Sequence, residues 1–191
     1  MSLKRVVDVL LSSAALIVLS PVLLGLAAAV KLSSPGPAIH WSMRVGRDNR
    51  LFAMPKFRTL RDGAPQLATH LFTDVDRWTT PVGKFLRRTS LDEAPQLWSV
   101  LTGDMSLVGP RPALFNQDDL VAMRTAAGVH VLRPGLTGWA QINGRDEIPM
   151  AQKVALDSEY LRRRNVSFDL AVMFLTAWRI AGAPIVRGFR R

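Results

Sequence analysis

Residues 4–31 read KRVVDVLLSSAALIVLSPVLLGLAAAVK, an apolar segment with basic residues at both ends. Between those ends, residues 6–30 carry a single charge, Asp8. As an α-helix this run is about 37 Å long at about 1.5 Å per residue, which exceeds the roughly 30 Å hydrocarbon core of a bilayer. The sequence therefore predicts a membrane helix over residues 1–31.

The topology of this helix follows less directly from the sequence. Basic residues such as Lys4 and Lys31 flank it on both sides, and the positive-inside tendency favours keeping both flanks in the cytoplasm. Pro21 removes a backbone donor near the middle, which predicts a kink, and the Ser20 hydroxyl can bond the freed carbonyl. A full span and a re-entrant hairpin both stay open, with the symmetric charge favouring the hairpin. A cleaved signal peptide fits the length of the run less well.

The rest of the chain, residues 32–191, is expected to form one domain. The breaker sequence SSPGP at 33–37 marks its start, and residues 38–60 predict a β-hairpin around a polar turn. Helical periodicity dominates later, at about 92–102, 114–127, 149–164 and 168–181. The last of these is too short to span, so it lies in the core or in the membrane interface. The expected fold class is α+β and mostly helical: an N-terminal membrane helix, then a small catalytic domain with a short β-hairpin and interfacial amphipathic helices.

Composition narrows the partners and the metals. Among 191 residues, 25 are Lys or Arg and 15 are Asp or Glu, and the resulting net charge of +10 favours nucleic acid, acidic lipid or phosphorylated substrates. The chain has no cysteine, which excludes disulfides, thiolate nucleophiles and Cys-ligated metals. Its three histidines are scattered, which argues against zinc. Any metal is then a hard cation held by carboxylates.

Two adjacent acids, Asp92 and Glu93, stand in the part of the chain that is densest in candidate functional residues. Their plainest interpretation is structural. Ser90-Leu-Asp-Glu fits a capping box, and acidic residues in the first turn of a helix are favoured by its dipole. Pro95 is tolerated more easily if Asp92 is the cap. Capping by itself can therefore explain one or both acids.

A chemical interpretation of the same acids uses the arginines around them, Arg87, Arg88 and Arg111. Two carboxylates amid guanidinium groups can hold Mg²⁺ and a diphosphate together, because the metal bridges phosphate oxygens while the guanidiniums pair them bidentately. A carboxylate can also attack phosphorus and so divide one transfer into two steps. Adjacent helical residues point about 100° apart, so one acid is expected to attack and the other to hold the metal.

A glycine-rich stretch, RPGLTGWAQINGR at residues 133–145, is a weaker candidate. Its glycines would let backbone amides approach an oxyanion, and its terminal arginines supply positive charge. An ordinary surface loop explains the same pattern. The chain lacks a P-loop and a GxGxxG after a strand, which argues against ordinary kinases and dinucleotide enzymes.

Six motifs taken in order resemble the bacterial sugar transferase family, the monotopic phosphoglycosyl transferases. They are SSPGP at 33–37, RVG at 44–46, KFRT at 56–59, SLDEAPQL at 90–97, GDMSLVGPRP at 103–112 and RPGLTGWAQINGR at 133–145. The resemblance covers nearly the whole chain, and six ordered motifs make a chance match improbable.

The resemblance implies a topology and a reaction. The membrane helix is expected to be re-entrant, broken at Ser20-Pro21, with both ends in the cytoplasm. Asp92 is expected to form a covalent phosphosugar intermediate from a UDP-sugar with release of UMP, and Glu93 to bind Mg²⁺. Polyprenyl phosphate, such as undecaprenyl phosphate, then attacks the intermediate to give a polyprenyl diphosphate sugar.

Cationic residues in the motifs or close beside them are expected to bind substrate. They are Lys56, Arg58, Arg88, Arg111, Arg133 and Arg145.

The expected location is the bacterial inner membrane, with the catalytic domain on the cytoplasmic face beside anionic lipids. The expected role is the first membrane step of exopolysaccharide, lipopolysaccharide O-antigen or other glycoconjugate assembly.

A basic membrane-anchored binding protein is the main alternative function. A surface that only binds phosphate gains nothing from acids at its centre, so no nucleic acid is expected as a partner. A multi-pass transferase would need more than one long apolar segment. The sugar stays open, and a homodimer is allowed.

Overall fold

The computed structural model describes residues 2–61, 63–64, 75–144 and 148–180. The elements in chain order are α1 (Leu3–Ser33), β1 (Ile39–Val45), η1 (Arg47–Asn49), β2 (Leu51–Phe57), α2 (Val75–Trp78), α3 (Pro81–Thr89), η3 (Leu91–Gln96), α4 (Leu97–Thr102), β3 (Ser106–Val108), β4 (Ala113–Leu114), α5 (Asp118–Ala126), η4 (Val129–Val131), β5 (Gly135–Thr137), α6 (Trp139–Ile142), α7 (Met150–Arg163) and α8 (Val166–Ile180). The fold is mostly helical with little sheet, as the sequence predicted.

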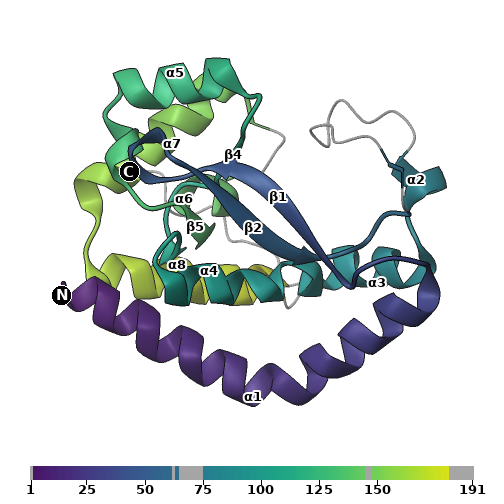
Figure 1. Ribbon diagram of the computed structural model, residues 1–191. Coiled ribbons are helices and arrows are strands. Elements are labelled where there is room, and N and C mark those ends of the chain that lie inside the picture. Colours follow the sequence, from purple (N-terminus) through teal and green to yellow (C-terminus); the bar gives the residue numbers. More distant parts are fainter. Residues whose placement is uncertain (1, 62, 65–74, 145–147, 181–191) are drawn as a thin grey trace.

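Helix α1 is long, apolar and bent. Among the described residues it is the one helix whose length and composition suffice to cross a membrane. Figure 1 shows the bend near its middle, where Pro21 lies within the helix. Pro21 has no N–H to donate to the carbonyl of Ile17, and the Ser20 hydroxyl donates to that oxygen at 2.8 Å instead. The predicted kink and its hydroxyl partner are therefore confirmed.

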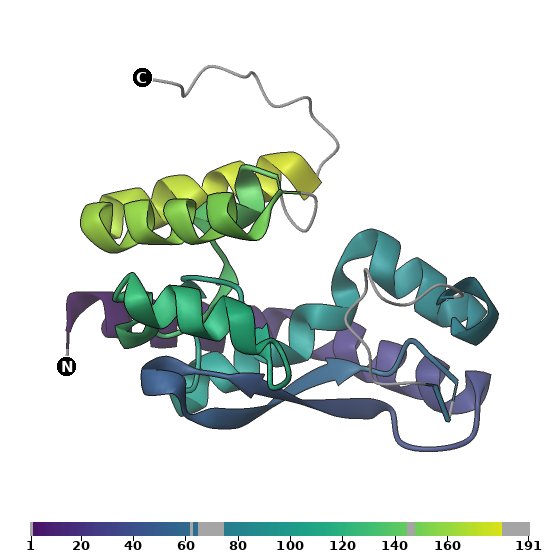
Figure 2. The ribbon, with the colours of Figure 1, turned by 90° about the horizontal axis from the view of Figure 1, so that it is seen from above.

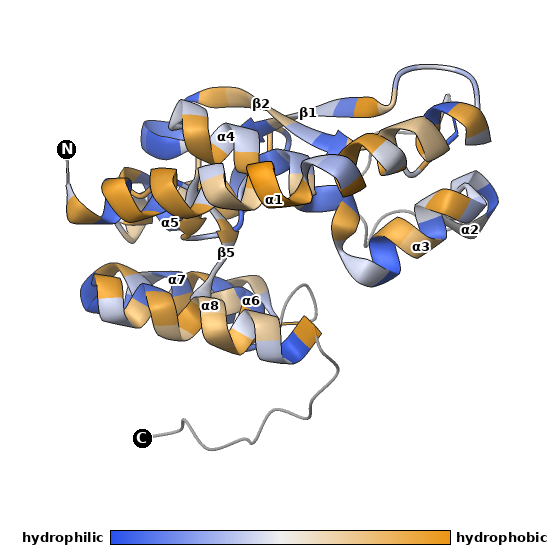
Figure 3. Ribbon diagram, turned by 90° about the horizontal axis from the view of Figure 1, so that it is seen from below, coloured by the Kyte–Doolittle hydropathy of each residue, from blue (hydrophilic) through white to orange (hydrophobic). Residues whose placement is uncertain are grey.

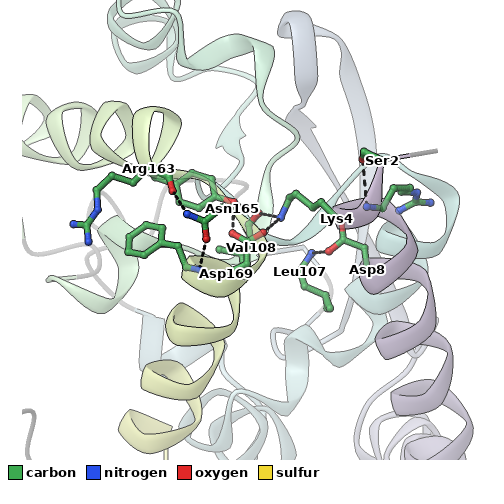
Figure 4. Close-up of polar contacts among 11 residues, drawn as sticks. Ser2, Lys4, Asp8, Leu107, Val108, Arg163, Asn165 and Asp169 are labelled. Atoms are coloured by element: carbon green, nitrogen blue, oxygen red, sulfur yellow. Dashed lines mark hydrogen bonds and ion pairs between the residues drawn. The ribbon is translucent and has the colours of Figure 1, made fainter.

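The first turns of α1 are tied to the rest of the protein by polar contacts, which Figure 4 shows. The Lys4 ammonium donates to the carbonyl of Val108 at 3.1 Å and pairs with Asp169 of α8 at 2.6 Å. Asp8, which is buried, accepts the backbone N–H of Leu107 at 3.1 Å. The single charge inside the apolar run thus joins α1 to β3.

The last turns of α1 pack against the same body of the protein. Val30 is buried in a cluster with Phe57 of β2 and Leu86 of α3. One face of the middle of the helix is exposed, with 73% of Ile17 and 74% of Val18 accessible, while Leu16 and Leu19 on another face pack against the main core. Both ends of α1 therefore lie against the domain, while one apolar face of its centre is uncovered.

The β-hairpin is confirmed. Strands β1 and β2 pair antiparallel from Ile39 opposite Phe57 to Val45 opposite Leu51. The turn places Asp48 and Asn49 at φ of 55° and 58°, a left-handed conformation that these two residue types tolerate better than most. β4 extends the sheet in the order β2-β1-β4, and β3 and β5 form a separate parallel pair.

The last two helices lie at the opposite edge of the domain from the hairpin. In Figure 2, α7 and α8 lie side by side at one edge, the hairpin lies at the opposite edge, and α5 lies between them. The main core contains side chains from β2, α4, α6 and α8, including Met54, Val100, Trp139 and Val172. α8 buries Val172 but exposes 65% of Phe174, and Figure 3 shows that apolar residues gather along α1 and α8.

The helices predicted at about 149–164 and 168–181 are confirmed as α7 and α8, and the one predicted at about 114–127 is confirmed as the shorter α5, because Leu114 belongs to β4. The prediction of one continuous α-helix at 92–102 is wrong, because the structure has two helical segments there. Pro95 lacks the N–H of a continuous α-helix, and the segment is a 3₁₀ helix, η3, followed by α4. The sequence interpretation did not include α3, which begins with Thr80 as its cap and Pro81 in its first turn.

Candidate active site

The two acids lie where η3 packs beside the hairpin strand β2. Asp92 and Glu93 form the first turn of η3, directly after Ser90, which adopts a left-handed conformation at φ 58°. Although Ser90 occupies the N-cap position, its hydroxyl makes no capping hydrogen bond. The capping-box interpretation with Ser90 as the cap is therefore wrong. Asp92 lies inside η3 and not at its N-cap position, although both acids occupy the first turn that the helix dipole favours.

Glu93 is held by an arginine from a distant part of the chain. Arg111, which follows β3 in a Gly-Pro-Arg-Pro segment, donates to both carboxylate oxygens, at 2.7 and 3.5 Å. Burial is the largest single effect and opposes the charged form of Glu93, but Arg111, Lys56 and Arg44 together outweigh it, so the pKa of Glu93 lies below its ordinary value. Glu93 is thus a fixed carboxylate that keeps its negative charge.

Asp92 is in a different electrostatic state from its neighbour. Burial, together with the negative charge of Glu93, raises the pKa of Asp92 to about 6. The cations Lys56 and Arg87 oppose that rise. Two adjacent carboxyl groups with pKa values displaced in opposite directions are typical of sites that assign them different roles.

Lys56 of β2 brings a buried positive charge to the acids. Burial and the nearby Arg44 lower the pKa of Lys56 to about 8, although Asp92 and Glu93 oppose the change. The sequence interpretation did not name Arg44 as a site residue. Strand alternation offered a signal, because His40, which lies opposite Lys56, and Arg44 share one face of β1.

Of the two arginines that end α3, the structure brings Arg87 to the acids. Its Nε donates to the Thr59 hydroxyl at 3.0 Å, and its charge lowers the pKa of Asp92. Arg88, which the sequence interpretation assigned to substrate, is exposed. Adjacent helical side chains point about 100° apart, so Arg87 and Arg88 face different directions.

Two other predicted substrate residues, Arg58 and Arg133, are not brought to the acids. The Arg58 guanidinium donates to the carbonyls of Ser34 and Pro35 after α1. Arg133 donates to the carbonyl of Gly103 at the end of α4, at 2.8 Å. Arg145 lies outside the described residues. Binding of substrate by Arg58, Arg133 and Arg145 stays a prediction.

The glycine-rich stretch is part of the interior and is not a surface loop. The N–H of Gly109 donates to Thr137 at 2.9 Å, and the N–H of Gly135 donates to Pro110 at 2.8 Å. A Cβ on Gly109, Gly135 or Gly138 would meet backbone atoms at 2.4 Å or less. Close backbone packing therefore explains these glycines and holds the segment that carries Arg111.

The donor set of this cluster fits a hard cation. The described residues contain no group of three or more His, Cys, Asp and Glu side chains able to hold a metal. Mg²⁺ does not need such a group, because it keeps several waters and typically binds one or two protein carboxylates together with substrate phosphates. Asp92 and Glu93 supply two adjacent carboxylates of that kind.

Known proteins similar to this chain were found in two comparisons. A family model described as bacterial sugar transferase matches residues 1–183. The UDP-glucose:undecaprenyl-phosphate glucose-1-phosphate transferase of Escherichia coli (strain K12) is 43% identical over 184 residues, which are 93% of this chain and 40% of that protein. The UDP-N-acetylgalactosamine-undecaprenyl-phosphate N-acetylgalactosaminephosphotransferase of Aeromonas hydrophila is 35% identical, over 91% of this chain and 42% of that protein.

The length of the relatives differs from that of this chain. The chain spans about 40% of the length of the first two curated relatives. It spans 83% of the exopolysaccharide production protein ExoY of Rhizobium meliloti (strain 1021), which is 36% identical over 91% of this chain. Each match covers more than nine-tenths of this chain and therefore extends over the positions of Asp92 and Glu93.

Proposed function

The chain belongs to the bacterial sugar transferase family, and from that premise we propose that it transfers a sugar 1-phosphate from a UDP-sugar to undecaprenyl phosphate. Relatives named for this type of transfer use UDP-glucose or UDP-N-acetylgalactosamine. The observation that carries the proposal is the Asp92-Glu93 pair, whose carboxyl groups have oppositely displaced pKa values within a cluster of cations. The products are UMP and an undecaprenyl diphosphate sugar.

The first step is attack by Asp92. A carboxylate oxygen of Asp92 forms a bond to the phosphorus that bears the sugar, and the bond from that phosphorus to the bridging oxygen breaks. UMP leaves with the electron pair of the broken bond, so no proton has to be supplied. The result is an acyl phosphate on Asp92 that carries the sugar.

The second step regenerates the enzyme. An oxygen of undecaprenyl phosphate attacks the same phosphorus, and the bond from phosphorus to Asp92 breaks. The carboxylate is released unchanged, and the sugar is left on a lipid diphosphate. Each step exchanges one phosphorus–oxygen bond for another, so the two steps balance without an oxidant or a further co-reactant.

The cations around the acids stabilise the charge that moves in both steps. Arg44, Lys56, Arg87 and Arg111 outnumber the two carboxylates, so a diphosphate enters a site of net positive charge. Fixed positive groups near a transferring phosphoryl group stabilise its transition state more strongly than water does. This excess of positive charge favours a phosphorylated substrate.

Mg²⁺ is the cofactor that this donor set favours, with Glu93 as the principal residue to hold it. Bound there, the cation would neutralise phosphate charge and polarise the phosphoryl oxygens. Glu93 is suited to that role because Arg111 lowers its pKa and fixes its carboxylate.

We also propose that α1 is re-entrant and that the domain lies on the cytoplasmic face of the inner membrane, beside anionic lipids. Lys4 and Asp8 near one end of α1 and Val30 near the other all contact the same domain. The bend at Pro21 lies between these contacts, and one apolar face of the centre, with Ile17 and Val18, is exposed. A straight span would have to break the contacts of one end, because its two ends lie on opposite sides of the bilayer.

Trapping the intermediate tests the reaction. The protein is incubated with Mg²⁺ and a panel of UDP-sugars labelled in the sugar, without lipid acceptor, and is quenched quickly. Label is expected on the peptide that contains Asp92, and Asp92→Asn should abolish both labelling and turnover because an amide is a poor nucleophile. Asp104→Asn serves as the control, since Asp104 accepts a hydrogen bond from Thr102 and has no role in the proposed chemistry. Near-normal turnover by Asp92→Asn would rule out the covalent route.

A further inference from the structure

The backbone that carries Arg111 is held at three successive carbonyls. Pro110 accepts from the N–H of Gly135 at 2.8 Å, Arg111 accepts from the Arg124 guanidinium at 2.8 Å, and Pro112 accepts from Arg44 at 3.4 Å. The prolines on either side also restrict the φ of this segment. Of the three donors, Arg124 is the side chain that comes from outside the catalytic cluster.

Arg124 is itself oriented by a buried acid. Its Nε and Nη2 donate to one oxygen of Asp157, at 2.9 and 2.6 Å, while its Nη1 donates to the Arg111 carbonyl. Arg124 lies on α5 and Asp157 on α7, and only 1% of Asp157 is exposed. The Arg124 guanidinium therefore links α5 and α7 to the backbone carbonyl of Arg111.

Stability alone does not account for a charged pair at this position. Burial of both charges removes them from water, and replacing such a pair with apolar residues is often neutral or stabilising. In keeping with that cost, burial raises the pKa of Asp157 even though Arg124 opposes the change. Apolar side chains would pack α5 against α7, but they could not donate to the carbonyl of Arg111.

We propose that Arg124 and Asp157 are positioning residues for catalysis, which hold the backbone of Arg111 so that its guanidinium is aligned with Glu93. Neither residue touches substrate in this scheme. The line of contacts runs from Asp157 to Arg124, to the carbonyl of Arg111, and from the Arg111 side chain to Glu93 at 2.7 Å. The effect on turnover rests on the proposed sugar phosphate transfer, whereas the effect on Arg111 does not.

The first test replaces the pair with apolar residues in the full chain, Arg124→Met together with Asp157→Val. Because misplacement of a catalytic group by about 1 Å can cost roughly a hundredfold in rate, kcat is expected to fall about 10- to 100-fold while the thermal midpoint is kept. Val154→Ala, at a buried site on α7, is the control: it should lower the thermal midpoint and leave kcat near wild type. Wild-type kcat in the double variant would overturn the proposal.

A double-mutant cycle separates positioning from general disruption. In an Arg111→Lys background, the loss caused by the apolar pair is expected to shrink to less than about twofold, because the group being positioned has gone. If the loss of kcat caused by the apolar pair is as large in the Arg111→Lys background as in the wild type, the pair does not act through Arg111, and the proposal is overturned. If the apolar pair fails to fold, Arg124→Lys takes its place in the cycle, since a lysine keeps the charge opposite Asp157 but lacks the fork that also reaches the Arg111 carbonyl.

A third measurement does not depend on activity. Phenylglyoxal modification of Arg111 is followed by peptide mass spectrometry, with Glu93→Gln setting the rate for a guanidinium that has lost its carboxylate partner. The apolar pair is expected to raise the rate several-fold towards that of Glu93→Gln, and an unchanged rate would overturn the proposal. A wild-type protein that releases no UMP from any UDP-sugar would instead refute the proposed function, and this labelling result would still decide the role of the pair.

Discussion

The pKa values of Asp92 and Lys56 predict a bell-shaped dependence of the transfer rate on pH. Asp92 attacks only as a carboxylate, so activity is present above its pKa of about 6 and is lost as the pH falls through that value. Lys56 contributes positive charge only below its pKa of about 8, so activity is lost again as the pH rises through that value. The optimum is therefore expected at about pH 7.

The size of the acid limb follows from the displaced pKa of Asp92. At pH 5 about 10% of a group with a pKa of about 6 is ionised, so kcat/KM should fall about tenfold from its plateau. A carboxyl at the ordinary value of 3.8 would still be more than roughly 90% ionised at that pH and would show almost no loss. An acid limb centred on about pH 6 would thus report the environment that burial and Glu93 create around Asp92.

Substitution of Lys56 tests the alkaline limb. Lys56→Arg keeps the charge well above pH 9, because an arginine is effectively always protonated, so the decline on the alkaline side should disappear while the acid limb stays. The plateau can also change, since a planar fork replaces a point charge. Lys84→Arg, an exposed position on α3, is the matched control and should keep both limbs.

UMP release is measured from pH 5 to pH 9.5 at constant ionic strength, with saturating undecaprenyl phosphate and varied UDP-sugar. Circular dichroism at each pH confirms that the protein stays folded. A rate that does not change between pH 5 and pH 7 would refute the assignment of Asp92. An alkaline limb that persists unchanged in Lys56→Arg would refute the assignment of Lys56.

Further outcomes are expected at other positions. Cysteines placed at Ser2 and Ser34 should both be labelled from the cytoplasmic side only, and labelling from opposite sides would contradict a re-entrant α1. Glu93→Gln should weaken Mg²⁺ binding and activity together, and an unchanged metal titration would move the metal ligand elsewhere. Arg111→Lys keeps the charge but loses the fork to Glu93, so activity should drop substantially in a protein with a normal circular dichroism spectrum; full activity would argue against its role. Leu86→Ala should lower the free energy of unfolding by about 2–5 kcal/mol, because Leu86 is fully buried; a loss below about 1 kcal/mol in chemical unfolding would contradict that packing.

Features that depend on neighbouring residues were legible in the sequence alone. The apolar run of α1, the kink at Pro21 and the hydroxyl of Ser20 that satisfies the freed carbonyl all follow from residues within one helical turn or one helix. The hairpin follows from short strands around a polar turn. The Asp92-Glu93 pair and the family were legible for the same reason, since each motif is a contiguous stretch.

Only the tertiary structure decided which cations meet the acids. Glu93 and Arg111 are 18 residues apart, and Lys56 lies near them on strand β2. Their contacts therefore depend on how β2, η3 and the segment after β3 pack together. The sequence could not show which of Arg87 and Arg88 lies near Asp92, because both are arginines. Only the orientation of α3 turns Arg87 towards Asp92.

For the same physical reason, the sequence could not show which backbone groups the other arginines contact. A guanidinium can bind a phosphate or a backbone carbonyl, and the residue type does not tell which. Arg58 and Arg133 have carbonyl partners that become available only where α1 and α4 end, and Arg124 finds its carbonyl 13 residues away in the chain. Local sequence determines which chemical groups this protein carries, and long-range packing determines what each group faces.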